Sequence, residues 1–426
     1  MEGVMDVKPG YKQTEVGVIP EDWEAVPIES LTPPNRKNGI VDGPFGSNLK
    51  TIHYRTSGIP IITSGYVTDG MFRADHYLYV DRSKFLEEKR SSVHPGDIVM
   101  AKIGERCGAS AILPATHETG ILSGNALKIT VDEARHSTSY VWQVLWGFHV
   151  SGKLEVLRTV GAQPALSIAN LKRFKIPVPS TNAEQRAIAT ALGDVDALLA
   201  GLDRLIAKKR DLKQAAMQQL LTGQTRLPGF SGEWEVKRLG EIAVIVSGGT
   251  PRTSEPTYWN GGIKWCTPTD ITRHAGKYLA ETERTISHSG LNNSGAVLLP
   301  IGTLLLCSRA TIGELKIAAE PVCTNQGFKS LVCRPGTSNE LLYYKLLTMK
   351  QQMVERAFGS TFLEISTRNV SALEVAAPPI DEQAAIAAVL SDMDAELAAL
   401  EARRDKTRAL KQGMMQELLT GRTRLV

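Results

Sequence analysis

Apolar residues recur every three or four positions in two long segments of the chain. In the first segment they are Ile188, Leu192, Val195, Leu199, Leu202 and Ile206, and in the second they are Ile386, Leu390, Met393, Leu397 and Leu400. Alternation by four and three places these side chains along one stripe of an α-helix, which is the pattern of a coiled-coil seam. About 40 residues without proline give roughly 60 Å of helix at ~1.5 Å per residue. The pattern therefore predicts two long helices, over 181–223 and 381–426.

Start and stop signals bound both helices. Prolines precede each segment, and Asn182 and Asp381 follow them as predicted N-caps, with Gln185 completing a capping box in the first. Each segment then reaches the sequence Leu-Leu-Thr-Gly, and we expect Gly223 and Gly421 to take the left-handed conformation that closes a helix.

The two helical segments are copies of one another. Residues 184–227 and 382–425 align without a gap, and more than half of the aligned residues are identical. A duplication this close predicts a molecule with two-fold pseudo-symmetry. Because a globular segment separates the copies, the second helix is expected to start near the end of the first and to pack against it antiparallel. The alternative is that each helix docks only on its own domain.

The segments before the helices correspond more faintly. Asp22-Trp23-Glu24 is echoed by Glu233-Trp234-Glu235, residues 94–113 resemble 299–318, and residues 121–129 resemble 322–332. Short β-strands surround these phrases, and one helix follows them at about 137–157 and 339–357. The prediction is an α+β fold with two mixed α/β domains joined by the two long helices. The predicted bounds are 1–180 for domain 1, 181–223 for the first helix, 224–380 for domain 2 and 381–426 for the second helix.

Composition narrows the class only a little. Hydrophobic residues make up 42% and charged residues 22%, as in an ordinary soluble protein. No apolar run reaches the ~20 residues of a membrane span, and Glu2 and Asp6 lie where a signal peptide would be apolar. We therefore expect a cytoplasmic protein without a membrane partner. The net charge of +4 does not by itself indicate a nucleic-acid ligand.

Motifs for catalysis are missing from the sequence. It contains no GxxxxGK[ST] phosphate loop, no strand–GxGxxG–helix fingerprint and no HExxH or Cys/His ligand set. The five cysteines form no CxxC pair and are expected to be buried thiols. We predict no catalytic residue, no metal ligand and no cofactor in this chain.

Glycine-rich turns are the best candidates for ligand contact. Bare backbone N–H groups and small hydroxyls can approach phosphates closely, and a nearby cation adds a salt-sensitive contact. Arg and Lys after apolar strands can also reach base edges. The predicted contact residues are Gly43, Gly46, Ser47, Lys50, Lys102 and Arg106 in the first domain, with Gly249, Thr250, Arg252, Tyr258 and Arg309 in the second. The alternatives are structural turns, a core aromatic and salt bridges at the rim.

The later half of each long helix is locally basic. The residues are Arg204, Lys208, Lys209, Arg210 and Lys213 in the first helix, and Arg403, Arg404, Lys406, Arg408 and Lys411 in the second. Such runs indicate either a contact surface for nucleic acid or a solvated helix face.

In this order the phrases resemble a known family. The chain is similar to the DNA-specificity subunit of type I restriction–modification systems, through TEVGVIPEDWE, GPFGSNLK, GGTP, YWNGG, CTNQGF, the proline–EQ–AI helix starts and the two LLTG helix ends. The resemblance spans nearly the whole chain. It implies two target-recognition domains that read the halves of a split double-stranded DNA sequence, and two helices that space them and dock two methyltransferase subunits.

The resemblance also assigns the chemistry to other subunits. S-adenosylmethionine would belong to the methyltransferase partners, and ATP with Mg²⁺ to restriction and translocase subunits of the full complex. Because the two domains differ from each other, base contacts do not transfer from the family residue by residue. Two alternatives remain: a stand-alone DNA methyltransferase or nuclease with an unrecognised site, and a coiled-coil scaffold without sequence preference.

Overall fold

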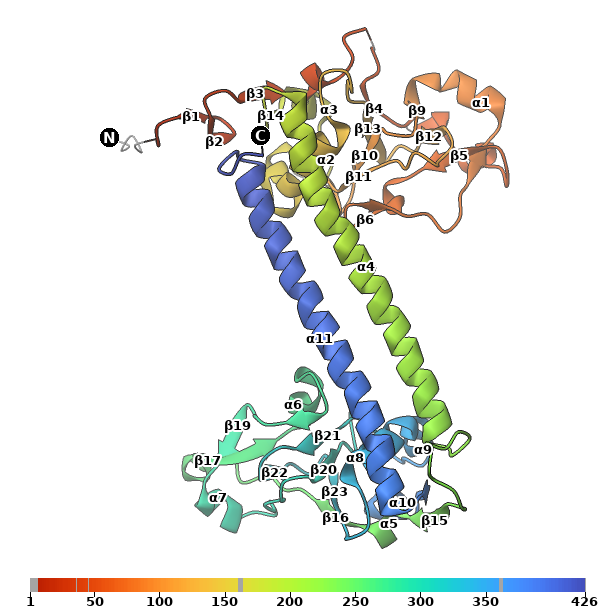
Figure 1. The fold of residues 1–426 in the computed structure, drawn as a ribbon, viewed down its shortest axis with the longest axis vertical. Helices are drawn as coiled ribbons and strands as arrows, with labels where there is room; N and C mark the ends of the chain where they lie inside the picture. Colours follow the sequence, from red (N-terminus) through yellow and green to blue (C-terminus); the bar gives the residue numbers. More distant parts are fainter. Residues whose placement is uncertain (1–6, 36, 45, 160–163, 360–362, 426) are drawn as a thin grey trace. The chain divides into compact units, whose positions relative to one another are not determined.

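The computed structural model describes residues 7–35, 37–44, 46–159, 164–359 and 363–425. The chain divides into two compact units (Figure 1). Unit 1 comprises Met1–Gly201 with Arg404–Val426, and unit 2 comprises Leu202–Arg403. Each unit therefore holds one predicted domain together with part of each long helix.

Unit 1 contains two four-stranded sheets. The first has the order β11-β10-β13-β4 and is antiparallel throughout, and the second has the order β8-β5-β12-β9 with β5 and β12 parallel. Their bounds are Ser110–Ile112 (β11), Ile98–Ala101 (β10), Ala126–Ile129 (β13), Ile40–Asp42 (β4), Tyr79–Val80 (β8), Ile59–Ile62 (β5), Gly120–Leu122 (β12) and Ser92–Val93 (β9).

Shorter elements complete unit 1. Two-stranded pairs join Tyr11–Thr14 (β1) to Gly17–Pro20 (β2), Glu24–Pro27 (β3) to Lys175–Val178 (β14), and Val67–Thr68 (β6) to Met71–Phe72 (β7). The α-helices are Arg82–Glu87 (α1), Thr138–Val150 (α2) and Ile168–Arg173 (α3). The 3₁₀ turns are Ile28–Leu31 (η1), Gly46–Asn48 (η2), Thr51–His53 (η3), Ser64–Tyr66 (η4), Lys89–Ser91 (η5) and Lys153–Leu157 (η6).

Unit 2 also contains two larger sheets. One sheet has the order β16-β23-β20-β21-β18 and the other β19-β17-β22. Their bounds are Ala243–Ser247 (β16), Lys329–Cys333 (β23), Leu304–Leu306 (β20), Leu315–Ala318 (β21), Tyr278–Leu279 (β18), Arg284–Ile286 (β19), Trp259–Cys266 (β17) and Val322–Thr324 (β22). A further pair joins Glu235–Arg238 (β15) to Glu374–Ala377 (β24).

The helices of unit 2 are short apart from the two long ones. They are Leu239–Ile242 (α5), Pro268–Arg273 (α6), His288–Asn292 (α7), Asn339–Thr348 (α8), Lys350–Glu355 (α9) and Thr367–Ser371 (α10), with one 3₁₀ turn at Pro256–Tyr258 (η7). The predicted domain helices are found in both units, but each is interrupted. Thr138–Val150 is followed by a separate 3₁₀ turn, and α8 ends at Thr348 before α9 begins.

The sheets of the two units share a common set of strands. The order β11-β10-β13-β4 in unit 1 matches β21-β20-β23-β16 in unit 2, and the parallel pair β5–β12 matches the parallel pair β17–β22. The α+β class and the pseudo-symmetric plan expected from the sequence are therefore confirmed.

Both long helices are unbroken but shorter than predicted. They are Asn182–Leu220 (α4) and Ile380–Leu418 (α11), so neither reaches the glycine of its stop signal. Gly223 and Gly421 do take left-handed conformations, with φ of 74° and 71°.

The predicted N-caps lie too late in the chain, by one residue at the first helix and by two at the second. The Thr181 hydroxyl, rather than Asn182, accepts the N–H of Glu184 at 3.2 Å. The second helix already includes Ile380, ahead of Asp381. Gln185 completes no capping box, because its side chain accepts the N–H of Ser137 and donates to the carbonyl of Pro179.

Ion pairs show that the helices run antiparallel and that the duplication extends to contacts. In unit 2, Lys213 pairs with Asp394, and Arg226 pairs with Glu382. In unit 1, the residues 198 positions away make the same contacts, since Lys411 pairs with Asp196 and Arg424 with Glu184. In both units, the higher-numbered residue of one helical segment meets the lower-numbered residue of the other.

The predicted apolar stripe is shared between the helix pair and the domains. Ile188 and Leu192 are buried in the core of domain 1, in one cluster with Leu418 and Leu419 at the end of α11. Ile386 and Leu390 occupy the same places in domain 2, with Leu220 and Leu221 from the end of α4. Leu202 and Ile206 are buried, whereas Val195, Leu199, Met393, Leu397 and Leu400 are half-buried. Each helix thus docks on its own domain near its start and also meets the end of the other helix.

Candidate nucleic-acid interface

In domain 1, three loops meet around the turn between β12 and β13. A Cβ on Gly43 would lie 2.1 Å from the carbonyl oxygen of Ser123, so only glycine lets the loop after β4 approach this turn. Asn125 then joins two further loops, because its side-chain oxygen accepts the N–H of Ser64 at 3.3 Å and its carbonyl accepts the N–H of Lys102 at 2.8 Å. The role of Gly43 is therefore packing, and its neighbours carry the exposed groups.

The predicted cations of domain 1 differ in availability. Lys102 is held by Asp42, with 2.6 Å between Nζ and Oδ2, and Arg90 reaches the same carboxylate at 3.3 Å. Arg106 is exposed, with its guanidinium 3.5 Å from the hydroxyl of Thr68. Lys102 therefore forms a salt bridge at the rim, which was the alternative to its predicted role as a contact residue.

The phrase after β4 carries the other predicted residues of domain 1. Gly46 begins η2 with φ of 58°, a value that favours glycine, and Lys50 is exposed at the start of η3. Ser47 belongs to η2, but its side chain lies outside the described part of the chain.

In domain 2, two tryptophans hold the glycine-rich loop that follows β16. The indole N–H of Trp265 donates to the carbonyl of Gly249 at 2.9 Å, and the indole N–H of Trp259 donates to the carbonyl of Arg252 at 3.1 Å. Both rings are buried and meet edge to face, with centroids 5.0 Å apart. The loop therefore rests on a rigid apolar support and presents the exposed side chain of Arg252.

The same loop is joined to the turn between β22 and β23. Gly248 packs so closely that an added Cβ would lie 2.1 Å from the carbonyl oxygen of Asn325, and Gly249 packs as closely against Gly295. The hydroxyl of Thr250 donates to the side-chain oxygen of Gln326 at 2.6 Å. The predicted contact residues do not include Gln326, although the motif CTNQGF contains it.

Arg309 lies on the loop after β20, which contacts the turn between β22 and β23. Tyr258 lies outside these loops. The Arg309 side chain is half-buried and lies against Gly327, where an added Cβ would be 3.2 Å from Nε. The next residue, Ala310, has φ of 62°, a left-handed conformation that is uncommon outside glycine. Tyr258 is half-buried in the cluster around Trp259 and Trp265, so it serves the support of the loop.

Backbone contacts align the two domains residue by residue. Lys102 accepts the N–H of Leu166, as Ser308 accepts the N–H of Ile365. The next residues form matching bridges, Ile103 with Ala165 and Arg309 with Glu364. Lys102 therefore corresponds to Ser308, and Arg309 corresponds to Ile103. The frameworks agree, whereas the side chains they present differ in charge and size.

Most of the basic residues predicted along the helices already have acidic partners. Lys209 and Arg210 reach Glu396 and Glu401 of α11, and Arg404 and Arg408 reach Asp405. Lys213 and Lys411 are also ion-paired, as described above, but their side chains are largely covered. Arg204, Lys208 and Lys406 are exposed.

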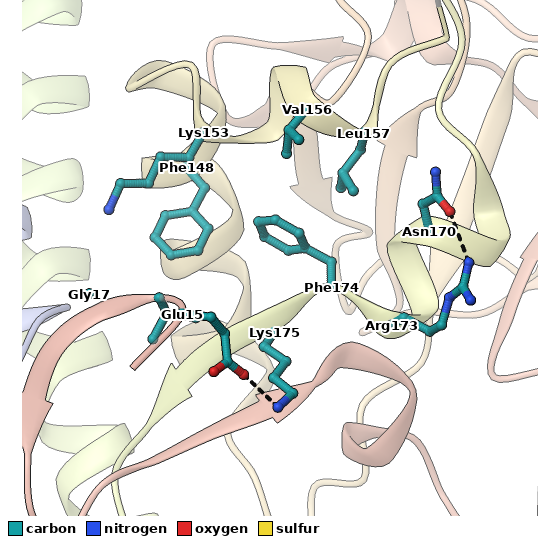
Figure 2. Close-up of a pocket in the computed structure, with 11 residues that line it drawn as sticks. Glu15, Gly17, Phe148, Lys153, Val156, Leu157, Asn170, Arg173, Phe174 and Lys175 are labelled. Carbon is teal, nitrogen blue, oxygen red and sulfur yellow. Dashed lines mark hydrogen bonds and ion pairs between the residues drawn. The ribbon is translucent and has the colours of Figure 1, made fainter. Parts of the chain in front are cut away.

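A cavity of about 750 Å³ lies elsewhere in unit 1, between the β1–β2 turn, the end of α2 and β14 (Figure 2). The rings of Phe148 and Phe174 meet at its floor, with centroids 6.0 Å apart. Lys153 covers the Phe148 ring, and Lys175 pairs with Glu15 at 2.5 Å. These lining groups contain no nucleophile–base pair, so the cavity is an apolar recess with a charged rim.

The described residues offer no metal centre and no membrane span. No group of three His, Cys, Asp or Glu side chains is placed to hold a metal ion, and no helix is both long and apolar enough to cross a bilayer. Burial raises the pKa of the Cys307 thiol to about 12 and that of the Cys323 thiol to about 11. These thiols are therefore protonated at neutral pH and poor nucleophiles.

Comparison with known proteins identifies the family. The family model for the type I restriction modification DNA specificity domain matches residues 20–208 and again residues 231–408. The putative type I restriction enzyme MjaX specificity subunit of Methanocaldococcus jannaschii is 24% identical over 97% of both chains. The MjaIX specificity subunit of the same organism is 37% identical over 40% of each chain, and the EcoR124I/EcoR124II specificity subunit of Escherichia coli is 24% identical over 53% of this chain and 57% of that protein.

Solved structures agree on the fold. The type I restriction–modification S subunit from M. genitalium has a TM-score of 0.60 at 16% identity and covers 96% of this chain and 98% of its own. The HsdS subunit from Thermoanaerobacter tengcongensis has a TM-score of 0.50 at 18% identity, with 95% and 98% covered. The chain belongs to the family of type I restriction–modification DNA specificity proteins. It is a DNA-recognition subunit and not a catalytic one.

Proposed function

We propose that this subunit reads a double-stranded DNA target made of two separated halves, one half with each domain. The observation that carries the proposal is the pair of matching loop frameworks with different side chains. Gly43 and Gly248 set the same close contact in the two domains, while Lys102 stands where Ser308 stands and Ile103 where Arg309 stands. A common framework with different exposed groups suits two related but distinct readings.

In domain 1, the exposed groups nearest the three-loop junction are proposed to contact DNA. Arg106, Lys50 and the N–H groups around Gly46 would meet phosphates or base edges, while Gly43 and Lys102 hold the loops in place. In domain 2, Thr250, Arg252, Gln326 and Arg309 would make the corresponding contacts. Arg309 would read guanine, because arginine is the residue that most often pairs with the O6 and N7 atoms of that base.

The long helices are proposed to set the distance between the two readings and to dock two methyltransferase subunits. Because α4 and α11 each extend through both units, their length couples the two domains. S-adenosylmethionine would bind to the methyltransferase subunits, and ATP with Mg²⁺ to a restriction and translocase subunit. In this proposal the chain itself binds none of these cofactors.

Mapping of methylated adenines in cells tests the proposal. Cells that carry the methyltransferase partner are compared with and without this chain. We expect a two-part methylated sequence that appears only when the chain is present. Methylation of the same sites without the chain, or a target with one uninterrupted part, would contradict the proposal.

A second experiment tests the alternative that the chain is a stand-alone methyltransferase. Purified chain incubated with labelled S-adenosylmethionine and mixed-sequence DNA should transfer no methyl group until the partner is added.

A further inference from the structure

An arginine that no sequence motif singled out lies beside the glycine-rich loop of domain 2. Arg284 begins strand β19, and its guanidinium carbon lies 3.6 Å from the centroid of the Trp259 ring and 5.3 Å from that of Trp265. A guanidinium this close to a ring face is stacked, which restricts it to one plane. Arg284 is nevertheless exposed, so the edge of that plane is open to solvent.

The stack is linked directly to the proposed contact loop. The Trp259 ring that supports Arg284 also donates its N–H to the carbonyl of Arg252. Arg284 itself lies opposite Trp265 in the β17–β19 pairing, and Trp265 holds the carbonyl of Gly249. One pair of indole rings thus contacts both the backbone of the loop and the side chain of Arg284.

The acidic groups nearest in the chain are already engaged. Glu283 pairs with Arg273 at 2.9 Å. Asp270 is buried and accepts the N–H groups of Thr267 and Glu283 and the hydroxyl of Thr267. Among the residues that the structure describes, the Arg284 side chain has no hydrogen-bond or ion-pair partner. Its guanidinium group stacks on the two tryptophan rings. Its charge and its N–H fork are therefore available to a ligand.

We propose that the Arg284–Trp259 stack is a DNA-binding element of domain 2, and that Arg284 takes a pair of acceptor atoms on the duplex. A fixed planar fork with parallel N–H donors matches two acceptors, as in a phosphate group or the O6 and N7 edge of guanine. Trp259 acts as a positioning residue, because it orients Arg284 and holds the loop without needing to touch DNA. This inference rests on the proposed reading of DNA by domain 2.

The test measures DNA binding by the full chain with its methyltransferase partner. Two labelled duplexes serve as probes, the mapped target and an unrelated sequence of equal length, and each is titrated at several salt concentrations. Arg284→Ala is expected to weaken target binding by tenfold or more. The matched control is Arg273→Ala, which removes a neighbouring exposed arginine whose charge is already paired and should change binding less than twofold.

The two kinds of acceptor give different results. A phosphate contact weakens both duplexes equally and lowers the slope of log K against log salt by about one. A guanine contact weakens only the target and relaxes one position in one half of the methylation map. Either result supports the element. If Arg284→Ala binds both duplexes like the wild type, with the same salt slope, the inference is overturned. The proposed two-part target is not affected by that result, because methylation mapping of the wild type tests it separately.

Substitutions of the tryptophan test the stacking itself. Trp259→Phe keeps a ring under Arg284 and should keep at least a third of the affinity. Trp259→Leu removes the aromatic face and should reproduce the loss of Arg284→Ala, with folding checked by circular dichroism. A folded Trp259→Leu chain with wild-type affinity would refute the positioning role. If that variant does not fold, the comparison of Arg284→Ala with Arg284→Lys decides, because lysine keeps the charge and loses the stacked plane. Wild-type affinity of Arg284→Lys would contradict the stack as the source of binding.

Discussion

Lengthening both long helices by one heptad should lengthen the gap between the two halves of the DNA target. In α4 the insertion belongs between Asp196 and Lys213, and in α11 between Asp394 and Lys411. These positions leave the pair Asp196–Lys411 intact within unit 1 and the pair Lys213–Asp394 intact within unit 2. Seven residues make almost two full turns, so the faces of both helices return to within about 20° of their original direction.

The expected size follows from helix geometry. Seven residues add about 10.5 Å at ~1.5 Å per residue. Successive base pairs rise about 3.4 Å, so the unread spacer should grow by about three base pairs. Because the reading loops are untouched, the sequence of each half should stay the same.

The assay is methylation mapping in cells that express the lengthened chain with its partner. A chain with the heptad in α4 alone is the matched control. In that chain the two helices differ in length, so the paired ends cannot both keep their partners, and we expect little or no methylation. Methylation at full level with the original spacer by the doubly lengthened chain would refute the idea that the helices set the distance.

Three further predictions concern single residues. Gly43→Ala and Gly248→Ala each force a Cβ to 2.1 Å from a carbonyl oxygen, so each should reduce DNA binding by more than tenfold. Binding to duplexes altered in one half should show that the two variants affect different halves of the target. Asp394→Asn loses a pair with Lys213 and weakens the bond from Tyr344, and should cost unit 2 about 1–2 kcal/mol in urea unfolding, whereas Arg210→Ala, in an exposed pair, should cost less than about 1 kcal/mol. Burial lowers the pKa of Lys345 from 10.5 to about 8, so between these pH values the unfolded chain binds more protons than the folded chain, and the free energy of unfolding should rise with pH. Lys345→Met should flatten this rise. An equal rise in the variant would contradict Lys345 as its source.

The sequence predicted the architecture well because its signals are long and repeated. The heptad pattern and the gapless similarity between residues 184–227 and 382–425 indicated two helices, and the contacts Lys213–Asp394 and Lys411–Asp196 reproduce that duplication in three dimensions. The helix starts were less accurate, since Thr181 and not Asn182 caps α4. Adjacent polar residues can both act as caps, and tertiary contacts decide between them.

The candidate site was predicted only in part, because its residues meet through tertiary contacts. Gly43 and Lys102 were selected for their motifs, but a packing contact with Ser123 and a salt bridge with Asp42 occupy them. Arg284 carries no motif, and its stacking on Trp259 depends on the pairing of β17 with β19. The sequence therefore selected loops that the fold brings together, whereas the side chains left exposed on those loops became visible only in the fold.

Exchange of one domain tests the central claim most directly, namely that each domain reads its own half of the target. Residues 20–178 are replaced by the matching segment of a relative with a different target, and methylated adenines are mapped with the same partner subunits. The account predicts that one half of the methylated sequence changes to that of the relative, while the other half and the spacer length stay as they were. A change in both halves, or a change in neither with methylation retained, would contradict it.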